Sequence, residues 1–278
     1  MGKSKSYQRE QYHLIYRSNM MEEKTLKRAI ATAVETGMIM LQNGAETYRV
    51  EETINRMISS KTNSPVEVFV MSTGIIVGAH INGEPYTTVS RVPSIGLDLE
   101  TIARANSFSR IFTQGDMTQE ETDIILGELR SPPKFSKPIR YAFSGMAGGF
   151  FVLMFGGSFV EFVLAYMASS ITVFSMDKLT VRRLNFFVKN ILGGLISALL
   201  SIFLVFVVGG LSITADFNTV IIGPLMTLVP GVSLTNGIRD LISGELIAGT
   251  TKMMEALFIA IALAFGVGIV LQGIIAFI

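Results

Sequence analysis

The sequence predicts an α-helical polytopic membrane protein with about five transmembrane helices, one of them broken, and an N-terminal cytosolic α+β domain. Charge divides the chain, because residues 1–140 contain 33 of the Asp, Glu, Lys and Arg residues and residues 141–278 contain only 12. Apolar runs of membrane-spanning length fill the second half, whereas the first half alternates between helical and strand periodicity. We therefore expect a cytosolic domain over residues 1–137 and a transmembrane domain over residues 138–278.

Two helices are expected to open the cytosolic domain. Apolar residues recur every three or four positions over residues 24–41, which is typical of an amphipathic helix. Asn43-Gly44 is expected to end it, since glycine readily takes the left-handed conformation beyond a helix terminus. The second helix is predicted over residues 46–59.

Three strands are expected next. Residues 66–71, 75–81 and 84–92 are rich in β-branched side chains. Asn82-Gly83 separates the last two runs and indicates a hairpin with a type I′ turn. A three-stranded meander is therefore predicted.

Two more helices are expected before the membrane. The first is predicted over residues 97–113. Thr118 and Glu121 have the spacing of a capping box at the start of a second helix that reaches residue 129. Ser131-Pro132-Pro133 then forms a short, stiff tether to the first span.

The apolar half is divided into spans by glycine and by charge. Tyr141–Met176 carries a single charged residue, Glu161, and is too long for one span of about 20 residues. Gly156-Gly157-Ser158 is expected to divide it into two. The predicted spans are about 141–157, 159–176, 186–210, 218–238 and 253–278.

Basic residues predict the orientation. Lys and Arg occur before the first span, between the second and third, and between the fourth and fifth, and neither of the other two loops contains any. The positive-inside rule then places the N-terminus in the cytoplasm and the C-terminus outside a multi-pass protein of the cell (inner) membrane. If 141–176 were one tilted helix, the chain would have one span fewer and the C-terminus would lie in the cytoplasm.

The stretch from Ile222 to Lys252 contains the clearest functional signal. It begins as an apolar run, and Pro230-Gly231 then interrupts the span. Broken helices at membrane depth form substrate sites in many transporters. Alternatively, one helix ends at Val229 and Pro230 is the first residue of a separate helix at the cytosolic edge.

Composition excludes several classes of protein. The chain has no cysteine and only two histidines, so a thiolate site is excluded and a histidine-rich metal site is not expected. Neither half has the basic excess of a nucleic-acid-binding protein. No phosphate-binding loop of the P-loop kind is present, which argues against an ATP-driven pump. No cofactor is expected, and the proton gradient is the energy source that remains.

Three segments together resemble the threonine/serine exporter family. They are NGAETYRVEETINRM (43–57), TTVSRV (87–92) and PGVSLTNGIRDLISGELIAGTTK (230–252). The family has a GAxxYRxE-like motif in a cytosolic domain and a PGxxxxNxxRDxxxG-like motif in the fourth of about five spans. The first motif is matched here by Gly44, Ala45, Tyr48, Arg49 and Glu51, and the second by Pro230, Gly231, Asn236, Arg239, Asp240 and Gly244.

The resemblance implies a transporter that works with a partner. Longer family members carry a second, smaller membrane segment at the C-terminus, and this chain ends at Ile278 without it. It thus resembles the larger subunit of a split exporter of threonine and serine whose small membrane subunit is a separate chain, so a hetero-oligomer is expected. Some split members are associated with dicarboxylate (succinate) export. A membrane-bound hydrolase is the less favoured alternative.

The candidate substrate or proton path follows the broken helix. Free N–H groups from Gly231 onward would face the carboxylate of an amino acid, and Pro230 and Ser233 lie on the same segment. Asn236 and Asp240 would accept from the ammonium, or Asp240 would carry the proton. The alternative is that Asp240 pairs with Arg239 or Lys252.

Two other sets of ionisable residues are functional candidates. Glu161 lies within a predicted span, which makes it a functional candidate, although exposure at the outer interface explains it nearly as well. Glu46, Arg49, Glu51 and Glu52 resemble a carboxylate cluster, but a surface ion network on one helix explains them more simply.

Overall fold

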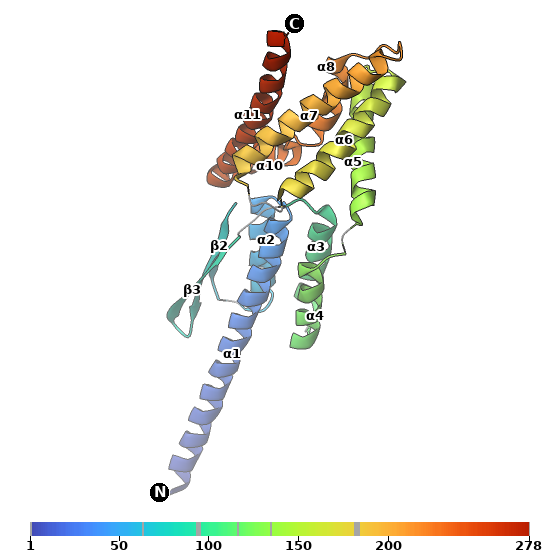
Figure 1. The fold of residues 1–278 in the computed structure, drawn as a ribbon. Coiled ribbons are helices and arrows are strands. Elements are labelled where there is room, and N and C mark those ends of the chain that lie inside the picture. The colour runs from blue at the N-terminus through green and yellow to red at the C-terminus, as the bar shows by residue number, and fades with distance from the viewer. Residues whose placement is uncertain are drawn as a thin grey trace. The chain divides into compact units, whose positions relative to one another are not determined.

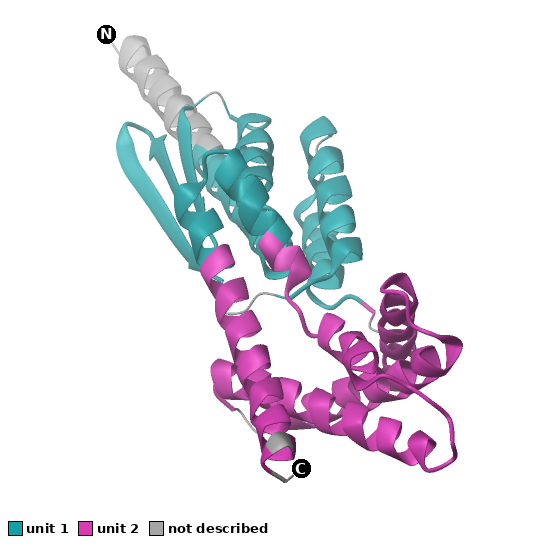
Figure 2. Ribbon diagram, turned by 90° about the horizontal axis from the view of Figure 1, so that it is seen from above, with its two compact units in different colours: residues 1–132, 235–252 teal, residues 133–234, 253–278 magenta. Residues whose placement is uncertain are grey.

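The structure, a computed structural model, describes residues 2–62, 64–92, 96–115, 117–133, 135–180 and 184–277. The chain forms two compact units (Figure 2). Unit 1 comprises Met1–Pro132 and Thr235–Lys252, and unit 2 comprises Pro133–Leu234 and Met253–Ile278. Residues 235–252, which the sequence places in the transmembrane half, pack with unit 1. The domain boundary near residue 137 remains a prediction.

The helices of unit 1 follow the predicted order (Figure 1). Thr118 caps the last of them together with Glu121, so the predicted capping box is confirmed. The first helix begins well before residue 24, where apolar periodicity alone had placed its start. The helices are α1 (Gly2–Gln42), α2 (Thr47–Ser59), α3 (Leu99–Gln114) and α4 (Gln119–Arg130).

The strands of unit 1 form an antiparallel meander in the order β1-β2-β3. Asn82 and Gly83 have φ angles of 53° and 84°, as a type I′ turn requires, and the predicted hairpin is confirmed. The strands are β1 (Val66–Met71), β2 (Gly74–Ile81) and β3 (Glu84–Arg91).

One hydrophobic core holds unit 1 together. Strand β2 turns alternate side chains, Ile75, Val77 and Ala79, into this core, as the two-residue period of a half-buried strand requires. Val50 and Ile54 of α2 lie in the same core, and neither is exposed to solvent. The apolar stripe of α2 is thereby buried against the sheet and α1, which positions the N-terminus of α2.

Unit 2 consists of helices. Gly156, with a φ of 85°, forms the turn between the first two, so the predicted break in the 141–176 run is confirmed. The helices are α5 (Lys137–Met154), α6 (Phe159–Thr180), α7 (Phe186–Gly209), α8 (Phe217–Val220) and α9 (Ile222–Met226), with the first residues of α10 (Gly231–Ile242) and most of α11 (Leu246–Phe277).

Three helices in the described part of the chain are long and apolar enough to cross a membrane, at Phe159–Leu179, Phe186–Gly209 and Leu246–Ile274. A fourth span is present if the pair Phe217–Met226 and Gly231–Ile242, bent by 61°, is counted as one. The predicted break at Pro230 is therefore confirmed. The predicted span at 141–157 falls in α5, which does not meet this test. Its first turn carries Lys137 and Arg140, and the count of five spans is not confirmed.

Glycines allow the helices of unit 2 to approach closely. A Cβ atom on Gly194 of α7 would lie 2.2 Å from the carbonyl oxygen of Leu263 in α11, and one on Gly266 of α11 would lie 2.1 Å from that of Ile191. Gly148 of α5 and Gly223 of α9 are in similar contact, because a Cβ on either would lie 3.0 Å from the other's carbonyl oxygen. Small residues at helix interfaces supply the packing that drives association in lipid.

Candidate functional site

The first part of the site is the turn between α1 and α2. Gly44 has a φ of 90°, its N–H donates to the carbonyl of Leu41 (3.2 Å), and the N–H of Ala45 donates to that of Met40 (3.1 Å). This pair of hydrogen bonds is a Schellman motif. Glycine is required at position 44 because other residues are strained in the left-handed conformation.

The second part is the turn between α10 and α11, where α10 ends in the same pair of hydrogen bonds as α1. Gly244 has a φ of 92°, its N–H donates to the carbonyl of Leu241 (3.1 Å), and the N–H of Glu245 donates to that of Asp240 (2.8 Å). A Cβ on Gly249 would lie 2.8 Å from the carbonyl oxygen of Gly237, so the two helices touch through backbone. The side chains at the end of α10 are thereby fixed.

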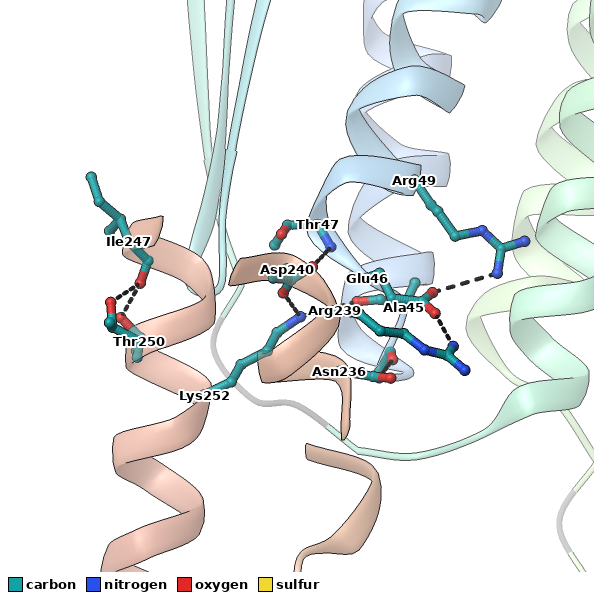
Figure 3. A network of polar contacts seen from close by, with 12 residues as sticks. Ala45, Glu46, Thr47, Arg49, Asn236, Arg239, Asp240, Ile247, Thr250 and Lys252 are labelled. Atoms are coloured by element: carbon teal, nitrogen blue, oxygen red, sulfur yellow. Dashed lines mark hydrogen bonds and ion pairs between the residues drawn. The ribbon is translucent and has the colours of Figure 1, made fainter. Parts of the chain in front are cut away.

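Asp240 joins the two turns and is fully buried (Figure 3). Its Oδ1 accepts from the backbone N–H of Thr47 at 3.1 Å, and its Oδ2 accepts from Lys252 Nζ at 2.7 Å. Lys252, also buried, donates in addition to the carbonyl of Ala45 at 3.4 Å. Because Thr47 is the first residue of α2, the carboxylate occupies the positive end of that helix, where an anion is stabilised.

A second layer of contacts surrounds this ion pair. Asn236 Nδ2 donates to the carbonyl of Gly44 at 2.8 Å, and Arg239 donates to Glu46 Oε1 at 2.8 Å. Arg49 reaches the other oxygen of Glu46 at 3.4 Å. Figure 3 shows Arg49 and Arg239 converging on Glu46 from α2 and α10.

The charge of Glu46 is stabilised where it lies. Burial on its own would raise the pKa of this carboxyl group. The N–H of its own residue, the hydrogen bond from Arg239 and the charge of Arg49 outweigh burial, and the net pKa lies below its ordinary value of 4.5. A lowered acid pKa in the folded state adds stability above the ordinary pKa, and that stability is lost as the pH falls through the folded-state pKa.

Glu51, the last residue of the first motif, has the opposite environment. Burial and the nearby carboxylate of Glu245 raise its pKa above 4.5, and the N–H of Val70 only partly opposes them. Tyr48 is half-buried on the same helix. In the described residues no group of three or more Asp, Glu or His side chains is arranged to hold a metal ion.

The two motifs on which the family resemblance rests therefore meet at one place. Of the two roles that the sequence left open for Asp240, pairing with Lys252 is present in the structure. A role for Asp240 or Asn236 on a substrate or proton path stays a prediction. Pro230 follows α9, and Gly231 and Ser233 lie in the first turn of α10, with Gly231 exposed and Ser233 half-buried.

Glu161 lies elsewhere, at one end of unit 2. Its Oε2 accepts from the N–H and hydroxyl of Ser158 at 2.6 and 2.9 Å, and its Oε1 accepts from the N–H of Asp216 at 2.8 Å. Ser158 and Glu161 thus form a capping box at the start of α6. Glu161 also connects the α5–α6 turn to the α7–α8 loop. Its place on a substrate path stays a prediction.

Comparison with known proteins decides the family. The model of the threonine/serine exporter family, ThrE, matches residues 31–273. The chain belongs to this family. The resemblance drawn from the two motifs is thereby confirmed.

The relatives of this exporter-family chain fall into two lengths. It is 21% identical to the "Probable succinate transporter subunit YjjP" of Klebsiella aerogenes, over 89% of this chain and 95% of the relative. It is 21% identical to the "Probable threonine/serine exporter" of Mycobacterium tuberculosis, over 92% of this chain and 48% of the relative, and 20% identical to the "Threonine/serine exporter" of Corynebacterium glutamicum, over 86% and 50%. The chain spans about half the length of these last two. No solved structure matches it.

Sequence reasoning missed two features of this ThrE-family chain. It did not bring Glu46 or Thr47 to α10, because residues 193 positions apart leave no periodic signal of contact. It also passed over the hydroxyl residues Ser169 and Thr172 in the middle of α6, although two hydroxyls three positions apart in an apolar helix were a visible signal.

Proposed function

We propose that this chain is the larger subunit of a secondary exporter of the small hydroxy amino acids threonine and serine. It is driven by the proton gradient and acts with a small membrane partner. The family match over residues 31–273 carries this proposal. Apolar helices of spanning length supply the membrane part that transport requires.

The geometry of unit 2 supports the orientation expected from the sequence. Glu161 and the N–H of Asp216 hold the α5–α6 turn and the α7–α8 loop together at one end, and neither loop contains a lysine or arginine. Arg140, at the start of α5, pairs with Asp177 near the end of α6. Basic residues therefore gather away from the Glu161 end, as expected if that end lies outside the cell. Five spans with α5 as the first, and an external C-terminus, are part of this proposal.

The cations near the broken helix favour a zwitterionic substrate. A dicarboxylate calls for at least two cationic partners. Arg239 is bound to Glu46 and Lys252 to Asp240, so neither is available to a second anion. An amino acid brings its own ammonium to balance its carboxylate, and the site does not have to supply that charge.

Succinate export is the second candidate. The relative from Klebsiella aerogenes, matched over 95% of its length, is named a probable succinate transporter subunit, and the threonine/serine exporters are matched over about half of theirs. The names of the relatives thus leave both substrate classes open.

The names of two relatives support a partner, because the "Probable succinate transporter subunit YjjP" proteins of Klebsiella aerogenes and Escherichia coli are each matched over 95% of their length and are named as subunits. We propose that the partner is a separate small membrane subunit. We expect the two to form a hetero-oligomer, and we expect the chain alone to transport poorly. Hydrolysis by the carboxylates of α2 is not favoured, because Glu46 is bound by two arginines.

Transport into everted membrane vesicles tests the proposal. Labelled threonine, serine and succinate are offered with and without a proton gradient, and with and without a co-expressed small subunit. We expect gradient-dependent uptake of threonine and serine that needs both subunits. Uptake of succinate alone would establish the second candidate, and the absence of uptake of all three would refute an exporter of either kind.

A further inference from the structure

Helices α6 and α7 of unit 2 contain four buried hydroxyl residues. Ser169 and Thr172 of α6 are fully buried, and within the described residues neither hydroxyl has a hydrogen-bond partner. Ser197 and Ser201 of α7 are also fully buried, and each donates to the carbonyl four residues earlier in its helix, at 2.8 Å. We call Ser169, Thr172, Ser197 and Ser201 the hydroxyl seam.

The contacts of α6 and α7 place these four residues at matching levels. Met176 of α6 lies against Gly193 of α7, where an added Cβ would be 3.2 Å from the methionine Cε. Toward the other end, Leu164 of α6 and Leu204 of α7 belong to one buried cluster. All four hydroxyl residues lie between these two contacts on antiparallel helices, and all are on buried faces.

The seam lies at the centre of the spans. Ser169 is ten residues from each end of the candidate span Phe159–Leu179, and Ser197 is near the middle of Phe186–Gly209. Substrate sites of secondary transporters lie near the bilayer midplane, where discontinuous helices meet. The seam has this depth.

Helix α9, which lies in the first part of the broken span, packs against α5 and α6 beside Ser169. A Cβ on Gly223 of α9 would lie 2.7 Å from Ala165 Cβ, and a Cβ on Gly148 of α5 would lie 2.0 Å from Ser169 Oγ and 3.0 Å from the Gly223 carbonyl oxygen. The next residue, Pro224, has no N–H, so the carbonyl of Val220 lacks the donor that a regular helix would supply. The hydroxyl of Ser169 and the backbone acceptors of α9 thus lie close together where α5, α6 and α9 meet.

Burying two unpaired hydroxyls is unfavourable. Each unsatisfied group costs on the order of 1–3 kcal/mol, and backbone carbonyls in lipid also need partners. Ser197 and Ser201 avoid this cost by bonding to their own helix, and Ser169 and Thr172 do not. A ligand that supplies hydrogen bonds to Ser169 and Thr172 would recover this free energy.

We propose that Ser169 and Thr172, with the backbone at Val220–Gly223, form the substrate-recognition site of this exporter. The site takes the hydroxyl and ammonium groups of a small zwitterionic amino acid. This inference rests on the proposed function and names the place where it acts. The enclosed seam is the closed stage of the transport cycle, and α9 moves away from α5 and α6 to admit substrate.

The chemistry of the seam selects against dianions. No charged residue lies between Glu161 and Asp177 in α6, or between Lys189 and the end of α7. Hydroxyls and carbonyls suit the ammonium and hydroxyl groups of serine or threonine, which has no net charge. Succinate would enter with two negative charges and no cation opposite them, at the high cost of burying unpaired charge in a membrane.

Replacing the hydroxyls by groups of similar shape tests this site. The full chain, with its co-expressed small subunit, is prepared as wild type, Ser169→Ala, Thr172→Val and the double variant. Ser175→Ala is the matched control, because Ser175 lies on the same helix and its hydroxyl already donates to the backbone carbonyl of Ile171. The melting temperature without ligand, threonine affinity and uptake into everted vesicles are measured.

We expect each single variant to bind threonine about fivefold more weakly or worse, and the double variant about 20-fold, from the loss of one or two hydrogen bonds. The melting temperature without ligand should stay the same or rise, because an unsatisfied group has been removed. Ser175→Ala should match the wild type in all three measurements.

Two results would overturn the site. In one, the double variant binds and transports threonine like the wild type. In the other, both single variants melt at lower temperature and keep their threonine affinity, which would assign the hydroxyls to packing. Both leave the proposed function intact. If the wild type neither binds nor transports threonine, serine or succinate, the proposed function fails and this site fails with it.

Discussion

The Asp240 network of unit 1 and the hydroxyl seam of unit 2 are both buried polar clusters, and they differ in how completely their groups are paired. Both oxygens of Asp240 accept hydrogen bonds, and Lys252 donates to two acceptors. Ser169 and Thr172 have no partner in the described part of the chain. In the Asp240 network the two charged groups are bound to each other and fix the local structure, although the buried Thr47 hydroxyl beside them has no partner in the described residues and Lys252 uses two of its three donors. The seam contains no charged group, and its two unpaired hydroxyls gain free energy when a ligand binds.

The largest effect that would sharpen this comparison is expected from Asp240→Asn. The change leaves the buried ammonium of Lys252 without a counter-charge, which typically costs about 3–5 kcal/mol. The melting temperature and the amount of folded protein should both fall. Glu255→Gln, an exposed position on α11, serves as the control.

Adding Lys252→Met to Asp240→Asn should recover part of the loss, because the double variant removes the unpaired charge. If Asp240→Asn is as stable as the wild type and only transport is lost, Asp240 belongs to the substrate or proton path, and the comparison between the clusters fails.

The next effect concerns the close helix packing that surrounds the seam in unit 2. In Gly194→Ala the new methyl group would meet the Leu263 carbonyl oxygen at 2.2 Å, and this oxygen is backbone and cannot rotate away. Overpacking of this kind costs about 1–3 kcal/mol, so thermal unfolding should begin at lower temperature. Gly268→Ala on α11 is the control, since nothing lies within 4 Å of its added Cβ. Equal stability of the two variants would show that the α7–α11 contact is not tight.

A smaller effect is expected from Asn236→Ala. The variant loses one hydrogen bond, from Asn236 Nδ2 to the carbonyl of Gly44, worth about 1 kcal/mol. Threonine affinity should stay within about twofold of the wild type, because Asn236 is expected to make no hydrogen bond to the substrate. A change of about twofold is smaller than the loss of one hydrogen bond to the ligand would cause. An unchanged melting temperature with much weaker threonine binding would instead place Asn236 on the substrate path.

The smallest effect concerns Glu51, whose carboxyl group is partly buried near the carboxylate of Glu245. Its raised pKa means that the folded state holds the proton more tightly than the unfolded state, so its ionisation lowers stability as the pH rises through and above 4.5. Glu51→Gln should therefore stabilise the protein at neutral pH, by less than about 1 kcal/mol at this partly exposed position. The difference should vanish below the ordinary pKa, as thermal melts across a pH series would show. A Glu51→Gln variant that is less stable at pH 7 would contradict this.

The local structure was largely predictable from the sequence because local chemistry decides it. Asn82-Gly83 can adopt the positive φ angles of a tight hairpin, and Thr118 with Glu121 satisfies the free N–H groups at a helix start. The break at Pro230 follows in the same way from the missing N–H of proline.

The long-range part was not predictable in this way. The sequence identified Asp240 and offered Lys252 as a partner, but the N-terminus of α2 completes the network, and no periodicity connects Thr47 to Asp240. The first predicted span is not confirmed, because α5 begins with Lys137 and Arg140, which lie outside the apolar run on which that span was predicted. Ser169 and Thr172 could have been noticed, but only packing shows that they are buried without partners.

The most direct test of the central claim compares the two clusters in one measurement, threonine affinity per folded molecule. It is made on the full chain with its small subunit, for Ser169→Ala/Thr172→Val and for Asp240→Asn/Lys252→Met. We predict that the seam variant loses about 20-fold in affinity, the loss expected for two hydrogen bonds, at unchanged melting temperature. The network variant should melt at lower temperature and bind threonine within about twofold of the wild type, as expected when no hydrogen bond to the ligand is lost. The reverse pattern, with affinity lost at the network and kept at the seam, would contradict the account.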